Sequence, residues 1–438
     1  MADSDDGSGW QATPPAPPAP PAPTGPPALT RRAWLTRAAG LPAAPWLAGA
    51  TPGAAAALAG GPEWTRSPGG ADAPRALHSR HRAPAQRHLM PAPPENAGFA
   101  AWHTPITAQR GIVTATPLHF AVHHNGLPDI DPQRHRLVVH GLVERPLQFD
   151  MQALARYPSV SRILFIECSG NTAANALSPT AMDIDAQELS GQVSCSEWSG
   201  VPLSLLLRET GVKPGARWAI AEGADGGSHQ RSIPLAKLMD DALLATHLNG
   251  EPLRPSQGAP LRLLLPGWEG NTNVKWLHRL ELTDRPAYTK DESGLYSEPL
   301  ADGRLERFTF WMEVKSLITQ PSGGMQLPEP GFVEIAGLAW SGRGRIRRVE
   351  VSTDGGRSWR DATLHGPVLA QAFTRFSLPW RWDGRATTLL SRATDETGRV
   401  QPTRAAWKAR YAAHAFNHYH AIQAWRIDRD GRVSNRYA

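Results

Sequence analysis

One short stretch decides how the chain folds: residues 162–171 read RILFIECSGN. Its apolar first half predicts a buried strand. Ser169, Gly170 and Asn171 then predict a tight turn, because glycine tolerates backbone conformations that other residues avoid. Cys168 stands where the strand meets the turn. A thiolate there can ligate a soft metal centre, while an inert buried thiol and a disulfide to Cys195 remain alternatives.

Two further clusters stand on either side of this strand in the sequence. Residues 257–262 (QGAPLR), 266–271 (PGWEGN) and 273–277 (NVKWL) predict strands at 261–265 and 274–282 around a glycine-rich loop. Arg262 and Lys275 lie near the loop ends, where they suit an anionic ligand or simply project into solvent. Residues 120–125 (FAVHHN) hold His123 and His124, which face opposite sides of a strand and are poor co-ligands for one metal.

The remaining pattern between residues 105 and 300 mixes helices with strands. A helix is predicted at 202–209 with Gly211 just beyond it, a strand at 218–221, and an amphipathic helix at 234–247 that stops at Asn249 and Gly250. We therefore expect an α+β domain over residues 105–300.

The pattern changes after residue 300. Short strands are predicted at 333–340, 347–353, 358–364, 373–382 and 387–394, with a hairpin turn at 354–356 (DGG). Short strands at such regular spacing favour an all-β, immunoglobulin-like sandwich. It is expected to occupy residues 301–438 together with the C-terminal tail.

The N-terminus has the composition of a targeting segment. Residues 11–29 are dominated by proline and alanine, and residues 30–36 (TRRAWLT) place two arginines ahead of a weakly apolar stretch. We expect residues 1–60 to be a proline-rich arm with a twin-arginine export signal, which implies a periplasmic protein. Residues 61–104 are expected to form an extended segment.

Composition excludes several classes of protein. The 438 residues contain only 2 cysteines and no C-x-x-C-H, so a disulfide scaffold, a cysteine-rich zinc module and an attached c-type haem are ruled out. A net charge of +6 over this length is too shallow to suggest nucleic-acid binding. No apolar run is long enough for a transmembrane helix.

Taken together, the clusters resemble the sulfite oxidase family of molybdopterin enzymes. The resemblance rests on residues 166–171, 258–262, 266–267 and 274–279, and on residues 349–359 (VEVSTDGGRSW) for the family's dimerisation domain. Residues 129–137, 194–203 and 422–425 further resemble the molybdenum subunits of sulfane dehydrogenases, the sulfur-oxidising component of the periplasmic thiosulfate-oxidising system. Such enzymes carry one molybdenum per chain on molybdopterin.

The resemblance implies a role for each matching residue. Cys168 falls on the molybdenum ligand, and Tyr296 falls on the active-site tyrosine, so these two are the expected catalytic residues. The expected cofactor-binding residues are His123, His124, Cys168, Gln257, Arg262, Asn273, Val274 and Lys275. Relatives have His or Asn in place of Gln257, which can still donate a hydrogen bond.

Two departures bear on the substrate. Sulfite oxidases carry arginines where this chain has Val122 and Ala173, so the forked oxyanion contacts that arginine provides are missing. Arg426, in the C-terminal tail, is a candidate to supply one of the missing positive charges. The substrate is therefore expected to be sulfite or a bulkier sulfane sulfur, for instance one bound to a sulfur-carrier protein.

The predicted activity is a molybdenum-dependent oxidation of a reduced sulfur compound. Because the chain has no haem motif of its own, a separate cytochrome c is expected to accept the electrons, and a homodimer is expected through the C-terminal domain. Two alternatives stay open: an S-oxide or N-oxide reductase on the same scaffold, and a non-enzymatic exported binding protein with a Cys168–Cys195 disulfide.

Overall fold

The computed structural model of the chain describes residues 87–88 and 99–438. The predicted arm and export signal over residues 1–60, and most of the extended segment 61–104, lie outside the described residues. The described part of that segment pairs into a small sheet. Strand β1 (Arg87–His88) lies beside β2 (Ala100–His103), which lies beside β3 (Ala121–His123).

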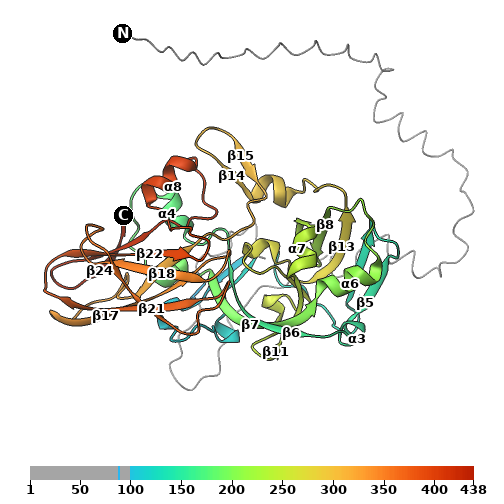
Figure 1. The fold of residues 1–438 in the computed structure, drawn as a ribbon, viewed down its shortest axis with the longest axis horizontal. Helices are drawn as coiled ribbons and strands as arrows, with labels where there is room; N and C mark the ends of the chain where they lie inside the picture. Colours follow the sequence, from blue (N-terminus) through green and yellow to red (C-terminus); the bar gives the residue numbers. More distant parts are fainter. Residues whose placement is uncertain (1–86, 89–98) are drawn as a thin grey trace, which may run out of the picture. The chain divides into compact units, whose positions relative to one another are not determined.

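Two five-stranded sheets carry the first half of the described chain (Figure 1). The first has the order β11-β10-β7-β6, with β12 also paired to β10; its strands are β6 (Val160–Glu167), β7 (Val193–Pro202), β10 (Leu243–Leu248), β11 (Glu251–Pro252) and β12 (Arg262–Leu264). The second has the order β5-β4-β13-β8-β9; its strands are β4 (Arg136–Gly141), β5 (Leu147–Asp150), β8 (Trp218–Gly223), β9 (Gln230–Pro234) and β13 (Leu277–Thr283). The predicted strand at 162–168 is thus confirmed as β6.

The helices are short. They are α3 (Met151–Leu154), α4 (Ala173–Leu177), α5 (Ala186–Ser190), α6 (Leu203–Thr210), α7 (Leu235–Asp240) and α8 (Arg404–Arg410). Single turns form η3 (Ile106–Ala108), η4 (Thr116–Leu118), η5 (Pro255–Gln257), η6 (Gly270–Thr272) and the wider η7 (Asp291–Leu295). The regular secondary structure of the described residues is mostly strand, and their longest helix has 8 residues, so the predicted α+β class is not confirmed.

One predicted helix is wrong over half its length. The pattern at 234–247 predicts a single helix, but α7 ends at Asp240 and residues 243–248 form strand β10. Leu243, Leu244 and Ala245 pair with β7 on one side and β12 on the other, and all three are buried. Sheet pairing and burial on both faces outweigh a local helical pattern, as tertiary context often does.

The C-terminal half is built from two antiparallel sheets, as the predicted sandwich requires (Figure 1, orange to red). One sheet contains β16 (Lys315–Gln320), β17 (Gly331–Trp340), β20 (Thr363–His365) and β21 (Thr374–Trp382). The other contains β18 (Ile346–Ser352), β19 (Arg360–Asp361), β22 (Thr387–Asp395), β23 (Gln423–Ile427) and β24 (Val433–Tyr437). A separate hairpin is formed by β14 (Ser297–Pro299) and β15 (Leu305–Arg307).

The strands predicted in this half are found, with one change. The predicted strand at 358–364 divides into β19, which pairs with β18, and β20, which pairs with β21 in the opposite sheet. The predicted turn is confirmed, because Gly355 and Gly356 adopt φ values of 76° and 90°. The Asp354 carboxylate closes that turn by accepting hydrogen bonds from the N–H and hydroxyl of Ser358.

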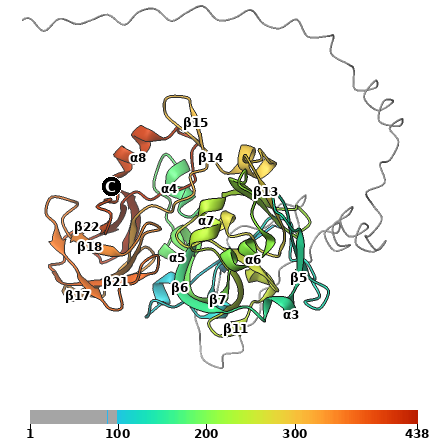
Figure 2. The same cartoon turned by 45° about the vertical axis from the view of Figure 1, so that its right-hand side comes forward.

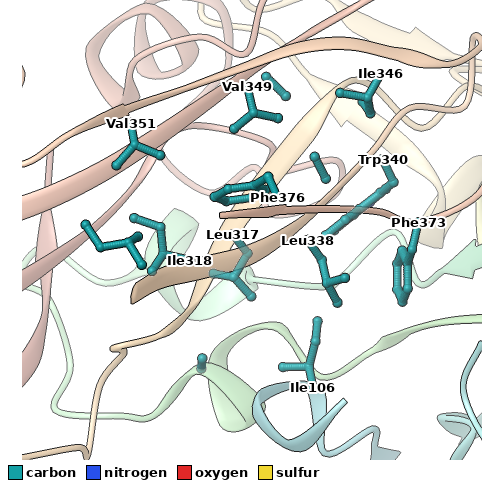
Figure 3. Close-up of a cluster of buried hydrophobic side chains, with 14 of the residues drawn as sticks. Ile106, Leu317, Ile318, Leu338, Trp340, Ile346, Val349, Val351, Phe373 and Phe376 are labelled. Carbon is teal, nitrogen blue, oxygen red and sulfur yellow. The ribbon is translucent and has the colours of Figure 1, made fainter. Parts of the chain in front are cut away.

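A large apolar core fills the sandwich and reaches beyond it. Figure 3 shows Leu317, Leu338, Trp340 and Phe376 from one sheet beside Val349 and Val351 from the other. The same cluster includes Phe165 and Cys195, a cross-strand pair on β6 and β7. Strand β6, which directly precedes Cys168, is therefore packed onto the C-terminal half.

Figures 1 and 2 also show α8 close to α4, the helix that follows the Cys168 turn. Trp407 of α8 and Ala176 of α4 belong to one buried cluster. No helix within residues 99–438 is long and apolar enough to cross a membrane.

Candidate active site

A cavity of about 510 Å³ lies among loops that follow the strands of the first half. It is lined by residues of 120–125, Cys168, Asp225, His229, Ser256, Arg262, residues of 270–276, and residues of 290–296. Every predicted site residue except Gln257 lines this cavity. Gln257 is buried beside it, and its carbonyl oxygen accepts a hydrogen bond from Nη1 of Arg262 at 3.2 Å.

Cys168 lies directly after β6, in the turn that the sequence predicts. Its N–H donates to Gln192 O at 3.0 Å, and its carbonyl oxygen accepts from the N–H of Asn171 at 3.0 Å. A Cβ on Gly170 would lie 3.9 Å from the Cys168 sulfur, so the turn keeps the space around the thiol open. Burial raises the pKa of the Cys168 thiol to about 11, so it is protonated until a metal replaces the proton.

The disulfide alternative is wrong. Both cysteines are free thiols. Cys195 is fully buried opposite Phe165, and its sulfur accepts a hydrogen bond from the N–H of Phe373 at 3.5 Å. Cys195 is therefore part of the core that joins the two halves, while Cys168 faces the cavity.

Arg262 and Lys275 are two of the cations that line the cavity. Arg262 is buried, donates to Asn273 O at 3.1 Å through Nε, and stacks its guanidinium over Trp198 at 5.2 Å. Burial lowers the pKa of Arg262 to about 9, and no carboxylate within residues 99–438 forms an ion pair with it. Lys275 donates to Val122 O at 2.9 Å, and its Nζ lies 2.7 Å from Nδ1 of His123. These positions suit an anionic group, as the sequence predicts.

The loop that carries Lys275 is held by Asn273 and Val274. The Asn273 side chain accepts from the N–H of Leu265 at 2.7 Å and donates to Glu269 O at 2.9 Å. The Val274 carbonyl oxygen accepts from the N–H of Leu263 at 2.9 Å. Gly258 has φ of +105°, and a Cβ there would lie 2.9 Å from Lys275 Cβ, so only glycine lets the two segments approach this closely.

His123 is the last residue of strand β3, and His124 follows it. His123 is buried, with its ring 5.9 Å from that of Trp276, whereas His124 is exposed, with its ring 5.9 Å from that of Phe99. The two rings therefore face different surroundings, which agrees with the sequence argument that they are poor co-ligands for one metal. The described residues contain no cluster of three or more His, Cys, Asp or Glu side chains that could hold a metal ion by themselves.

Tyr296 follows η7 and shares the cavity with Cys168. The Arg231 guanidinium lies 4.8 Å from the centre of its ring, and the His229 ring approaches edge-on at 6.0 Å. Burial, and then the nearby Cys168, raise the pKa of Tyr296 far above its ordinary value. The phenol is therefore neutral and able to donate a hydrogen bond.

Sequence reasoning missed several cavity residues. Asp225 is buried and accepts from Nδ2 of Asn125 at 3.2 Å and from the N–H of His229 at 3.0 Å. Nε2 of His229 lies 2.9 Å from Asn271 O, and Asn271 also donates to Ser169 Oγ at 3.3 Å. The one available signal was the Asp-Gly-Gly turn at 225–227, which begins four residues after the end of the strand predicted at 218–221.

The two residues that replace the arginines of sulfite oxidases lie in different places. Val122 lines the cavity, whereas Ala173 begins α4 and does not line it. Arg426 does not replace them: it belongs to β23, pairs with Asp428 at 3.1 Å, and is not among the lining residues. The lining cations are Arg262, Lys275 and Lys290.

The residues present fit a molybdopterin cofactor. The group offers a phosphate, a polar pterin ring and a metal that accepts a thiolate. The cavity offers the Cys168 thiol, the buried cation Arg262 with no carboxylate partner among the described residues, Lys275, and the Asp225 carboxylate. Cation, acceptor and thiol thus come together in one enclosure, as such a cofactor requires.

Comparison with known proteins agrees with this fit. Residues 124–290 match the family described as oxidoreductase molybdopterin binding domain, and residues 306–425 match the Mo-co oxidoreductase dimerisation domain. The crystal structure of the sulfane dehydrogenase SoxCD from Paracoccus pantotrophus is similar, with a TM-score of 0.77 and 41% identity. That likeness covers 81% of this chain and 90% of the other.

Curated relatives give the same result. Mitochondrial sulfite oxidase of Mus musculus is 31% identical over 333 residues, which cover 69% of this chain and 60% of that protein. NADH nitrate reductase of Solanum lycopersicum is 31% identical over 339 residues, which cover 68% of this chain and 37% of that protein. The chain thus spans well under two thirds of these relatives. The fold, the site and the similarities together place the chain in the sulfite oxidase family of molybdopterin oxidoreductases, with sulfane dehydrogenase as a structural neighbour.

Proposed function

We propose that the chain oxidises a reduced sulfur compound, either sulfane sulfur or sulfite. The single observation that carries this proposal is that the free thiol of Cys168 and the neutral phenol of Tyr296 line one cavity with the cations Arg262 and Lys275. The likeness to a sulfane dehydrogenase at 41% identity supports sulfur as the element oxidised.

Each residue has a defined task in this proposal. Cys168 holds molybdenum as a thiolate, and the rest of the cofactor is bound by His123, His124, Gln257, Arg262, Asn273, Val274 and Lys275. When bound, the cofactor supplies oxygen-atom and electron transfer. Tyr296 donates a hydrogen bond from its phenol and so steadies an oxygen atom of the substrate or product. Its raised pKa keeps that proton on the oxygen throughout the neutral range.

The cavity favours a substrate other than a small, doubly charged anion. Val122 presents an apolar side chain where sulfite oxidases present a guanidinium, and Arg426, which pairs with Asp428 in β23, does not line the cavity. Of the three lining cations, Arg262 and Lys275 are assigned to the anionic cofactor, which leaves Lys290. Sulfane sulfur bound to a carrier protein does not bring the two negative charges of a small anion into the cavity. It therefore needs fewer cations there.

The wider setting of the protein follows from this activity. We infer a periplasmic enzyme exported by the twin-arginine route, which passes electrons to a cytochrome c because the sequence has no haem-attachment motif. The Mo-co dimerisation match supports a homodimer formed through residues 301–438, with residues 105–300 as the catalytic domain.

Steady-state assays with cytochrome c as acceptor test the proposal. Sulfite, thiosulfate and protein-bound sulfane sulfur are each supplied to purified, molybdenum-loaded protein. We expect cytochrome reduction with protein-bound sulfane sulfur to exceed that with free sulfite. No reduction with any of the three would contradict sulfur oxidation.

Reductase activity on the same scaffold is the second candidate, favoured by the loss of the oxyanion-binding guanidinium at Val122. Reduced viologen with an S-oxide or an N-oxide as oxidant tests it directly. Turnover there, combined with inactivity in the cytochrome assay, would assign the reductase role.

A further inference from the structure

Next to the cavity-lining residues lies a buried network of four ionisable side chains. Arg231 has 0% of its side chain exposed, Glu292 0% and Glu269 1%, and His418 has 5% exposed. Arg231 pairs with Glu269 at 3.0 Å and with Glu292 at 2.9 Å, while Nε2 of His418 lies 2.7 Å from Glu269 Oε2. Because burying ions is costly even when they are paired, stability alone explains such a network poorly.

The network reaches Tyr296 through Arg231. The guanidinium lies 4.8 Å from the centre of the phenol ring, a distance typical of a cation–π contact. Glu292 keeps the guanidinium in place from the other side, and its carboxylate also accepts a hydrogen bond from the N–H of Ser232 at 2.7 Å. The orientation of Arg231, and hence of the ring that it covers, is fixed by the two carboxylates.

The same network reaches the Cys168 turn through His418. The N–H of His418 donates to Ser169 O at 2.8 Å, directly after the cysteine. His418 also has φ of +52°, in the left-handed region that a side chain with a Cβ seldom adopts. Such local strain persists only where the surroundings impose it, and it is frequent at functional sites. The histidine comes from the C-terminal tail, and the sequence alone assigns no role to it.

We propose that Glu269 and His418 are a positioning pair, which holds the phenol of Tyr296 and the turn carrying Cys168 at a fixed separation. Glu269 is the branch point, with one carboxylate oxygen on Arg231 and the other on His418. Neither residue of the pair lines the cavity, so both act through their neighbours. The inference rests on the proposed roles of Cys168 and Tyr296.

The test uses Glu269→Gln and His418→Gln in the full chain, because both replacements keep hydrogen-bonding capacity and approximate volume. Glu350→Gln is the matched control, since Glu350 is also a buried carboxylate paired with an arginine, Arg392 at 2.8 Å, but lies in the sandwich. Cofactor-free protein is treated with iodoacetamide, and modification of the Cys168 peptide is followed by mass spectrometry. We expect the Cys168 rate to change by at least about threefold in the two test variants and to stay unchanged in Glu350→Gln.

Protein loaded with the molybdenum cofactor supplies the second readout. The Mo(V) electron paramagnetic resonance spectrum should shift in both test variants, and kcat should fall about tenfold with KM little changed. If the pair acts as a unit, the double variant should be no worse than the more affected single variant. Rates and spectra equal to those of the unmodified protein in both variants would overturn the proposal.

Folding failure also has a defined meaning. If Glu269→Gln does not fold, His418→Gln and the charge-conserving Glu269→Asp decide the question by the same readouts. Failure of all three to fold would give the pair a purely structural role and overturn the positioning claim. Molybdenum retained in Cys168→Ser would contradict the proposed function instead, and the alkylation result in cofactor-free protein does not depend on that outcome.

Discussion

At the scale of single residues, the cavity combines groups whose ordinary chemistry is altered by burial. Cys168 keeps its proton because its pKa is raised to about 11, and Arg262 holds its charge less firmly because its pKa is lowered to about 9. A bound anion relieves the second of these costs, and a metal replaces the proton of the first. Both shifts therefore favour a cavity that is completed by its cofactor.

Tyr296→Phe tests the phenol. Loss of one hydrogen bond made as charge develops is expected to lower kcat by about 10- to 1000-fold while molybdenum content stays the same. The measurements are kcat in the cytochrome assay and metal analysis of the same sample. Unchanged kcat would remove Tyr296 from the chemistry, and lost molybdenum would make it a cofactor-binding residue.

Arg262→Gln tests the buried cation. Loss of a charge-assisted contact should weaken retention of the pterin by about 10- to 100-fold, measured as pterin remaining after dialysis. Arg254→Gln is the control, because Arg254 directly precedes η5, the turn that contains Gln257, but its side chain is 29% exposed and pairs with Glu251 at 3.0 Å. Equal retention in the two variants would contradict the anion-binding role of Arg262.

The site residues differ in how well sequence alone could find them. Cys168, Arg262, Asn273 and Lys275 lie in contiguous runs whose residue types and spacing already indicate the site. Those missed, such as Asp225, Arg231, Glu269 and His418, come from three segments that are distant in the sequence: residues 225–231, Glu269 and His418. Apart from the Asp-Gly-Gly turn at 225–227, their local sequence does not indicate that they belong together, so only the fold shows it.

At the scale of helices and strands, the pairing between strands determines the secondary structure where the local sequence pattern predicts it wrongly. Strand β6 was predictable because its apolar run is short and ends in a glycine turn. Strand β10 was not, because residues 234–247 have helical spacing and only contact with β7 and β12 turns their second half into a strand. The position of β12, and with it Arg262, depends on that pairing.

Glu222 of β8 contacts Gln230 of β9 and both His278 and Arg279 of β13, so it links three strands of the second sheet. Its ionisation should make the stability of the protein depend on pH. Burial raises the pKa of Glu222, but His278 and Arg279 of β13 outweigh it and lower the pKa from 4.5 to about 2. The stabilisation is therefore complete above about pH 4.5 and is lost as the pH falls toward 2. Glu222→Gln should cost about 2–3 kcal/mol of unfolding free energy at pH 7 and flatten the acid limb of the stability curve.

Urea unfolding at pH 7 and at pH 3 measures this effect. Glu281→Gln is the matched control, since Glu281 pairs with the same Arg279 at 3.4 Å but is 33% exposed, so its loss should cost less than about 1 kcal/mol. Equal losses in the two variants would contradict the account of Glu222.

At the scale of the whole molecule, the two halves share one core, and the ion pair between Lys315 and Glu167 also joins them. Lys315 of β16 and Trp340 of β17 both bond the buried carboxylate of Glu167, at 2.9 Å and 2.7 Å, and Glu167 directly precedes Cys168. The C-terminal half thereby supports the segment that carries Cys168, in addition to the dimerisation role proposed for it. The sandwich was predictable from strand spacing, but this contact between the halves was not.

Lys315→Met tests that support. It leaves Glu167 buried with its charge unpaired, which should cost about 3–5 kcal/mol of unfolding free energy and lower molybdenum content. Lys237→Met is the control: Lys237 is equally buried and pairs with Asp241 at 2.8 Å, away from the Cys168 turn. It should lose stability but keep its molybdenum, and a similar loss of metal in both variants would contradict a specific role for the Lys315–Glu167 pair.

The proposed function depends on Cys168 binding the molybdenum of a molybdopterin cofactor in this cavity. The decisive measurement is metal and pterin analysis of the purified protein, of Cys168→Ser and of Cys195→Ser. We expect one molybdenum per chain in the unmodified protein and in Cys195→Ser, and loss of the metal in folded Cys168→Ser. Molybdenum at the unmodified level in Cys168→Ser would show that Cys168 is not the ligand.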